Sequence, residues 1–240
     1  MLNDGTEYIA VDLEMTGLKA SRDKILEIGA VRCKNGQVTA RFQMLVNPLR
    51  KLPPNVIALT GITDAMAENG ETLQRAMEAF VEFFGGLPLV GHNLMCDFAF
   101  LKQNAVNLGI PFEANGLDTL KLARQLLLEP EKKTMESLGQ YFGFLPSQAH
   151  RALGDAEAVF CLLELLRARF AGSRPDLFVP KPLLYRVKKQ GPITAKQKKY
   201  LKELSEYHKI ELPASFEGMT KNEASRLTDQ ILLRYGKRRR

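Results

Sequence analysis

The stretch that decides the fold is Tyr8-Ile-Ala-Val-Asp-Leu-Glu-Met-Thr-Gly17, an apolar run interrupted by two carboxylates. A short apolar run that ends in an acid predicts a central β-strand over residues 8–12. Asp12 and Glu14 are two positions apart, so on an extended chain both side chains point to the same face of the sheet. Two like charges side by side are unfavourable unless a cation lies between them, and carboxylate oxygens suit Mg²⁺ or Mn²⁺. The end of this strand is therefore a candidate metal site.

The segments that follow predict a mixed sheet with helices on its faces. Two apolar-rich runs, 25–33 and 38–46, are joined by Lys34-Asn-Gly-Gln37, and Asn-Gly favours a tight hairpin turn. Three antiparallel strands are therefore expected to open the fold, with a brief strand at 87–90 further on. Helical spacing of apolar residues and glycine stops predict helices at 72–84, 94–108, 119–128, 134–142 and 151–170. Strands followed by alternating helices and strands indicate an α/β domain.

A proline-rich segment divides the chain. Residues 1–171 are expected to form the α/β domain, and residues 172–192 carry several prolines and Gly172, which is typical of a linker. Two further helical stretches, 194–207 and 220–235, predict a small helical C-terminal module over 193–240.

The charge of the chain is distributed unevenly. The formal net charge is +7, but residues from Asp176 onward hold 16 basic and 7 acidic side chains, a net of +9. The first 175 residues hold 18 basic and 20 acidic side chains, a net of −2. A basic C-terminal part favours an acidic partner such as nucleic acid, although a merely solvated, lysine-rich surface explains the charge equally well.

The cysteines and the apolar stretches bear on the compartment. Cys33, Cys96 and Cys161 are scattered and include no CxxC pair, which fits a reducing compartment. The N-terminus shows no secretory signal pattern, and no apolar stretch approaches membrane-spanning length. We therefore expect a cytoplasmic protein without a membrane partner.

Three more reactive residues lie at the starts of predicted helices. Asp97 belongs to Gly91-His-Asn-Leu-Met-Cys-Asp97-Phe, and His150 and Asp155 belong to His150-Arg-Ala-Leu-Gly-Asp155. Each has an ordinary explanation by itself, because an aspartate in a first helical turn complements the helix dipole and a lone histidine is usually structural.

Taken in order, these motifs are more informative. Asp-x-Glu-x-Thr-Gly, Gly-His-Asn-x-x-x-Asp-Phe and His-x₄-Asp resemble the three motifs of the DEDD-type 3′→5′ exonucleases, in the branch with histidine in the third motif. The resemblance covers roughly the first 170 residues and extends to the epsilon proofreading subunit of bacterial DNA polymerase III. It implies a ribonuclease-H-like fold and release of nucleoside 5′-monophosphates from 3′ ends. A catalytically inactive relative is the alternative, and the intact set of acids speaks against it.

The resemblance also implies roles for individual residues. Asp12, Glu14, Asp97 and Asp155 would hold two divalent cations, Mg²⁺ or Mn²⁺, which activate a water and stabilise the leaving 3′ oxygen. His150 would be the general base. The expected substrate-contacting residues are Met15, Thr16, Gly17, Ile62, His92 and Asn93. For several of them a structural role is the alternative: packing for Met15, an ordinary turn for Leu59-Thr-Gly-Ile-Thr63, and loop stabilisation for His92 and Asn93.

The substrate is expected to be DNA, with a proofreading or repair role. The segment 59–63 and the Gly-His-Asn motif are similar to proofreading exonucleases, whereas Asp12-Leu-Glu-Met-Thr-Gly-Leu18 is similar to oligoribonuclease. Because only a contact to the 2′-OH separates RNA from DNA, RNA trimming stays an alternative. A non-catalytic scaffold subunit of a polymerase complex is the alternative from another class.

Two C-terminal segments suggest partners. Residues 193–235 resemble a small helical module found at the ends of various bacterial nucleic-acid enzymes, on Ile193-Thr-Ala-Lys-Gln-Lys-Lys-Tyr-Leu201 and on 219–227. Its lysines at 196, 198, 199 and 202 and the basic end 237–240 predict a grip on the phosphate backbone, with a solvated face on a protein-docking module as the alternative. Pro175-Asp-Leu-Phe178 partly resembles the peptide that docks replication proteins, such as a replicative polymerase, on the sliding clamp. The leading glutamine is missing, and packing of the aromatic residue on its own domain is the alternative.

Overall fold

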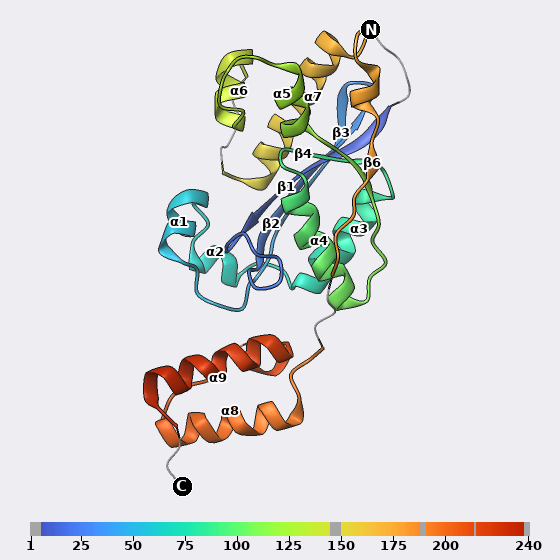
Figure 1. Cartoon of the computed structure of the whole chain (residues 1–240). Helices are drawn as coiled ribbons and strands as arrows, with labels where there is room; N and C mark the ends of the chain where they lie inside the picture. The colour runs from blue at the N-terminus through green and yellow to red at the C-terminus, as the bar shows by residue number, and fades with distance from the viewer. Residues whose placement is uncertain (1–5, 145–149, 188–190, 214, 238–240) are drawn as a thin grey trace. The chain divides into compact units, whose positions relative to one another are not determined.

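The computed structural model describes residues 6–144, 150–187, 191–213 and 215–237. Residues 1–48 and 52–187 form one compact unit, and the C-terminal residues form a second one. The first unit is a sheet with helices on both faces, and the second is built around a pair of helices (Figure 1).

The first unit is built on a mixed six-stranded sheet with the order β3-β2-β1-β4-β5-β6. The first three strands are antiparallel, β4 and β5 continue parallel to β1, and β6 closes the edge antiparallel to β5. The strands are β1 (Glu7–Met15), β2 (Ile25–Lys34), β3 (Gln37–Leu45), β4 (Leu89–Gly91), β5 (Asn115–Asp118) and β6 (Lys181–Pro182). The prediction of a mixed α/β sheet is confirmed.

The turn between β2 and β3 explains why these strands pair where they do. Asn35 and Gly36 have φ values of 52° and 72°, so both lie in the left-handed region that a two-residue hairpin turn requires. Lys34 faces Gln37 across the turn, and the register shifts once along the hairpin, between Arg32 and Cys33. The predicted Asn-Gly hairpin is confirmed.

Helices cover both faces of the sheet (Figure 1). Side chains of β1 alternate, because Ile9, Val11 and Leu13 belong to one core while Tyr8 and Ala10 belong to the other. The first core receives α3 (Leu73–Phe84) and α4 (Met95–Leu108), and the second receives α5 (Thr119–Leu126), α6 (Met135–Phe142) and α7 (Ala152–Phe170). Two short helices, α1 (Pro54–Thr60) and α2 (Asp64–Glu68), surround a small core of their own. Among the described residues no helix is both long and apolar enough to cross a membrane.

The structure differs from the predicted linker at 172–192. Pro175–Phe178 forms a 3-10 turn, and Lys181–Pro182 is the edge strand β6, paired with Asn115 and Gly116. The apolar side chains of this segment account for the difference, because Leu177 and Phe178 pack against one core and Leu183 and Tyr185 against the other. The strand β5 has no counterpart among the predicted strands either, since Asn-Gly-Leu-Asp is too short to show an alternating pattern.

The second unit consists of α8 (Ala195–His208), a 3-10 turn at Phe216–Gly218 and α9 (Lys221–Tyr235). Both helices begin with a capping box, Thr194 with Gln197 and Thr220 with Glu223, in which side chain and backbone satisfy each other. Between them lies a small core of Ile193, Leu201, Leu204, Phe216, Met219, Ala224 and Ile231. The predicted C-terminal helices are thus present, each within a residue of its expected bounds.

Candidate active site

Three of the predicted acids lie together at the end of β1. One carboxylate oxygen from each of Asp12, Glu14 and Asp155 can be chosen so that all three atoms lie within 4.8 Å of one another. Asp12 and Glu14 continue along β1 the face that carries Tyr8 and Ala10, and Asp155 comes from the first turn of α7, which packs on that face. Such a set of hard oxygen donors fits a divalent cation such as Mg²⁺ or Mn²⁺.

Asp97 approaches the same site from another element. It lies in the first turn of α4, and its side chain is 4 % exposed. Its charge is among those that raise the pKa of Asp12. A hydrogen bond from the backbone of Leu13, between the two acids of β1, favours the ionised form of Asp97. All four predicted acids are therefore in one electrostatic environment, and their assignment as metal ligands stays a prediction.

The protonation behaviour of the acids reflects burial and repulsion. Burial, followed by the charges of Asp97 and Asp155, raises the pKa of Asp12 well above its usual value. Burial and the charges of Asp155 and Glu27 raise the pKa of Glu14 to about 7, and burial raises the pKa of Asp97 to about 8. Burial also raises the pKa of Asp155, against the opposing influence of His150. Without a cation these carboxylates thus compete for protons near neutral pH, and a bound cation would relieve the repulsion.

His150 stands directly beside Asp155. Its backbone N–H donates to Asp155 Oδ2 at 3.1 Å, and its side chain is exposed. Its φ of 61° lies in the left-handed region, which histidine adopts more readily than most residues. The imidazole is therefore accessible at the rim of the acidic cluster, as a general base would have to be.

The start of α7 is held in place by Arg151 and by three residues outside the motifs, Glu27, Gly29 and Gln43. The carboxylate of Glu27, fully buried on β2, accepts from Arg151 Nε at 3.0 Å and from the N–H of Ala152 at 3.0 Å. Gln43 Nε2 donates to the same carboxylate at 2.9 Å. A Cβ at Gly29 would lie 2.0 Å from the carbonyl carbon of Ala152, so the helix rests directly on the strand. Because Asp155 follows within one turn, these contacts position it.

Sequence reasoning overlooked Glu27, Gly29 and Arg151, although a trace of them is visible. Glu27 is an acid inside the apolar run Ile25-Leu-Glu-Ile-Gly-Ala30, where an unpaired charge would be costly. In the sheet register Glu27 lies opposite Glu14, and Gly29 lies opposite Asp12. The two residues of β2 that hold the start of α7 therefore lie directly opposite the two acids of β1, and only the strand pairing shows this.

The loop after β1 uses Thr16 and Gly17 for its own structure. The N–H of Lys24 donates to Thr16 Oγ1 at 2.9 Å, and Thr16 is 8 % exposed. A Cβ at Gly17 would lie 2.6 Å from Oδ2 of the buried Asp23, so the close approach that requires glycine is to Asp23. Met15 packs partly against the core of the first unit. The substrate contacts predicted for these residues stay predictions, and the structure supplies internal reasons for each of them.

Ile62 lies away from solvent. Its side chain is 0 % exposed and packs with Leu26, Leu52, Val56 and Ala67. The surface of this segment is instead formed by residues such as Leu59, which is 58 % exposed. The side chain of Ile62 is therefore not exposed for the predicted contact with terminal bases, because it is buried in the small core around which α1 and α2 pack.

His92 and Asn93 stabilise the loop before α4. His92 Nδ1 lies 3.0 Å from Thr119 Oγ1 and His92 Nε2 lies 2.8 Å from the carbonyl oxygen of Lys133, so both ring nitrogens are engaged. Asn93 has a φ of 67°, and its N–H donates to Asp118 Oδ1 at 3.1 Å. The structure thus gives both residues loop contacts. His92 still borders a hollow of about 690 Å³ whose other lining residues include Arg124, Lys132 and Lys133.

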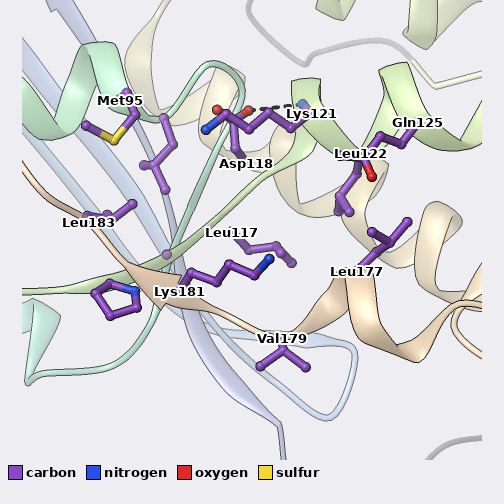
Figure 2. A pocket seen from close by; sticks show the side chains of 13 residues that line it. Met95, Leu117, Asp118, Lys121, Leu122, Gln125, Leu177, Val179, Lys181 and Leu183 are labelled. Atoms are coloured by element: carbon purple, nitrogen blue, oxygen red, sulfur yellow. Dashed lines mark hydrogen bonds between the residues drawn. The ribbon is translucent and has the colours of Figure 1, made fainter.

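A separate hollow of about 180 Å³ lies between α5, β5 and the segment that leads into β6. Figure 2 shows Leu177 and Val179 of that segment around the hollow, with Lys181 of β6 and Leu183 after it, together with Leu117 and Leu122. The hydrogen bond drawn there is the cap of α5, which Lys121 donates from its backbone to Asp118. None of the four predicted acids lines this hollow, so it is distinct from the acidic site.

A mixed sheet with helices on both faces is the ribonuclease-H-like fold of solved exonuclease structures, and here a carboxylate cluster lies at the end of its first strand. The family model described as "Exonuclease" matches residues 9–163, which is more than half of the chain. The chain belongs to the DEDD-type 3′→5′ exonuclease family.

Curated relatives are consistent with this family. The DNA polymerase III PolC-type of Clostridium perfringens is 33 % identical over 171 residues, which are 71 % of this chain and 12 % of that protein. A putative bifunctional exonuclease/endonuclease protein of Mycobacterium tuberculosis is 37 % identical, over 68 % of this chain and 27 % of that protein. The chain thus spans only about a tenth to a quarter of the length of these relatives.

Solved structures share the fold. The zinc-bound complex of Escherichia coli exonuclease I with single-stranded DNA superposes with a TM-score of 0.62 at 19 % identity, over 73 % of this chain and 42 % of that chain. Exonuclease X in complex with 5′-overhanging duplex DNA superposes with a TM-score of 0.54 at 24 % identity, over 68 % of this chain and 93 % of that chain. At these identities the likeness establishes the fold of the first unit.

Proposed function

We propose that this protein is a divalent-metal-dependent exonuclease that releases nucleoside 5′-monophosphates from DNA 3′ ends, in proofreading or repair. The observation that carries the proposal is the clustering of Asp12, Glu14 and Asp155 within 4.8 Å beside the buried Asp97. The carboxylates of this cluster raise one another's pKa, which is unfavourable for a purely structural site. The arrangement therefore suits cation binding.

The roles of the individual residues follow from their positions. Asp12, Glu14, Asp97 and Asp155 would hold two Mg²⁺ or Mn²⁺ ions, which supply activation of a water and stabilisation of charge on the leaving 3′ oxygen. His150, exposed beside Asp155, would accept the proton of the attacking water. Glu27 and Arg151 hold the segment that carries both residues.

DNA is the proposed substrate because several similar proteins act on it or bind it. The PolC-type relatives are DNA polymerases by name, and the exonuclease I and exonuclease X structures contain DNA. RNA trimming with the same site is the second candidate, and the observation that favours it is the oligoribonuclease-like Asp12-Leu-Glu-Met-Thr-Gly-Leu18. A cytoplasmic location remains part of the proposal.

A replicative polymerase is a proposed partner, supported by the PolC-type relatives in which a similar segment is part of a polymerase. Docking on a sliding clamp through Pro175–Phe178 has less support. Leu177 and Phe178 pack partly against the core of their own unit, so the segment would have to detach before it could serve as a clamp peptide.

The proposal is tested with the purified chain and its Asp12→Ala variant, each incubated with matched DNA and RNA oligonucleotides in Mg²⁺, Mn²⁺ or EDTA. We expect stepwise shortening of DNA by the unaltered chain only, abolished by EDTA, and a fall of at least roughly 1,000-fold in the variant because a metal ligand is lost. Preference for short RNA would move the protein to RNA turnover. Absence of cleavage on both substrates would contradict the proposal and favour a scaffold role.

A further inference from the structure

The C-terminal unit presents one basic face whose lysines are available to a ligand. Lys196, Lys199, Tyr200 and Glu203 are spaced i, i+3, i+4 and i+7 along α8 and therefore share one side of the helix. Leu201 and Leu204 are not part of this set and are buried in the core of this unit. We call the four residues, with Thr194 and Gln197, the α8 face; they line a hollow of about 420 Å³.

The structure separates the lysines of α8 into two kinds. Lys198 forms an ion pair with Glu217, and Lys202 Nζ lies 3.7 Å from Glu217 Oε1 and 5.7 Å from the centre of the Phe216 ring. These two lysines stabilise the turn that joins the helices. Within the described part of the chain Lys196 and Lys199 make no ion pair, and both are exposed. Only the second pair is thus free to neutralise a charge from outside.

An aromatic ring lies on the same side of α8 as the two available cations, since Tyr200 is one turn after Lys196 and directly follows Lys199. Tyr200 is 40 % exposed, so its ring is open to contact from outside. Gln197 beneath it is committed to the helix pair, because its Nε2 donates to the carbonyl oxygen of Lys221 at 3.0 Å and to Ser225 at 3.1 Å. The hydrogen bonds of Gln197 therefore hold α8 against α9, while Tyr200, Lys196 and Lys199 are exposed to solvent.

We propose that the α8 face binds single-stranded nucleic acid, with Tyr200 stacking on a base while Lys196 and Lys199 contact flanking phosphates. Proteins that bind single strands without sequence preference combine cations along the phosphate backbone with aromatic rings on which the bases stack. Residues 188–240 hold 14 basic and 6 acidic side chains, and this net charge of +8 attracts a polyanion to this unit. The inference rests on the proposed function in that the bound strand is taken to be the substrate.

The test measures binding apart from cleavage. The full chain in EDTA is titrated into a fluorescein-labelled thymidine 20-mer, and anisotropy is followed at 50 to 200 mM salt. We expect the variant Lys196→Ala/Lys199→Ala to bind about tenfold more weakly at the lower salt. The slope of log affinity against log salt should fall by about 1.4, because each single-strand phosphate contact contributes about 0.7.

The ring is tested separately from the charge. Tyr200→Ala should weaken binding about 5- to 100-fold, the range that loss of one stacked base produces. Tyr200→Phe keeps the platform and should stay within about twofold of the unaltered chain. Glu203→Gln removes the one carboxylate of the face and should strengthen binding.

A matched control removes the same charge elsewhere in the unit. Lys209→Ala/Lys221→Ala eliminates two exposed lysines outside the face and should change affinity by no more than about twofold. Equal losses in the two double variants, or no loss in Tyr200→Ala, would overturn the proposal in favour of diffuse attraction. Equal competition by a glutamate 20-mer would overturn it in favour of an acidic protein partner.

Failure of this inference is distinguishable from failure of the proposed function. All variants are also assayed in Mg²⁺ on a trinucleotide, which offers few phosphates to a second binding site. If the trinucleotide is cut equally by every variant and 20-mer binding is unaffected by them, the α8 face is wrong and the exonuclease stands. If nothing is cut but the face variants lose binding, the face stands and the exonuclease is wrong.

Discussion

Asp12 shows at the scale of one residue why the site is built for a cation. Its carboxylate is surrounded by those of Asp97, Asp155, Glu14 and Glu27, and each raises its pKa in addition to burial. Only Glu27 of this group has a guanidinium partner at short range, Arg151 Nε at 3.0 Å. Repulsion among the other carboxylates disfavours the fully ionised, metal-free site. A bound divalent ion would cancel this repulsion.

This repulsion predicts how stability depends on pH. The site carboxyls bind protons more tightly in the folded chain than in the unfolded one, where their pKa values lie near about 4. Their contribution to the free energy of unfolding is therefore fully present below about pH 4 and is lost as the pH rises through the folded values of about 7 for Glu14 and 8 for Asp97. In EDTA, urea unfolding should show stability decreasing between pH 5 and pH 8.

Two comparisons check the cause of this pH dependence. Mn²⁺ in millimolar excess should restore stability most strongly at the upper end of the range, because the ion replaces the protons. Asp12→Asn should flatten the profile in EDTA, since the central charge is gone. A profile in EDTA that rises between pH 5 and pH 8, or that Asp12→Asn leaves unchanged, would show that the four carboxyls are not coupled as described.

At the scale of elements, the junction of β2 and α7 determines where Asp155 lies. Gly29 allows the first turn of α7 to rest on the strand, and Glu27 satisfies both the N–H of Ala152 and the side chain of Arg151. A buried carboxylate with four donors is stabilising only while all of them stay in place. The helix therefore cannot shift along the strand without leaving a buried charge unpaired.

Gly29→Ala should displace this junction. The added methyl would meet the backbone of Ala152 at 2.0 Å, so the start of α7 must move and the chain should lose about 1–3 kcal/mol of stability. We expect Mn²⁺ affinity, measured by calorimetry on the folded variant, to fall at least about tenfold because Asp155 leaves the cluster.

Gly172→Ala is the matched control for this substitution. A Cβ at Gly172 meets nothing within 4 Å, and this glycine lies after the end of α7. The control should bind Mn²⁺ like the unaltered chain. If Gly29→Ala binds the ion equally well, the junction does not position Asp155 and its role is limited to packing.

At the scale of the whole molecule, the chain combines a nearly neutral catalytic-type unit with a strongly basic one. Residues 1–187 carry a net charge of −1, whereas residues 188–240 carry +8. The acids of the site belong to the first unit, and the lysines that remain available on α8 belong to the second. Under the proposed function, the first unit supplies the chemistry and the second attracts the substrate.

Removal of residues 193–240 should therefore affect long and short substrates differently. We expect weaker binding of a 20-mer, by about tenfold or more at low salt, and a smaller salt dependence, because a basic unit is lost. Cleavage of a trinucleotide should remain within about threefold of the full chain. Gel assays of single encounters should show fewer nucleotides removed per binding event. Unchanged affinity for the 20-mer would refute a substrate-holding role for the C-terminal unit.

Much of this molecule could be read from local sequence. The Asn35-Gly36 hairpin, the helices that end at Gly85 and Gly109, and the alternating β1 strand all follow from periodicity and turn chemistry, and all are present. Asp12 and Glu14 share a face for the same reason. The basic end at 238–240, which belongs to the predicted phosphate grip, lies outside the described residues.

What only the tertiary structure decided concerns residues far apart in the chain. Sequence alone shows neither that Glu27 and Gly29 dock α7, nor that Leu177 to Tyr185 fold back on the first unit, nor that Glu217 occupies Lys198 and Lys202. It also predicts that Ile62 contacts terminal bases, with an ordinary turn as the alternative, whereas the fold buries the Ile62 side chain. Local periodicity indicates the strands and helices and shows which acids share a face, because these features depend on neighbours in sequence. Which polar groups are paired and which are left free is determined by contacts between distant segments, and on those contacts the geometry of the site depends.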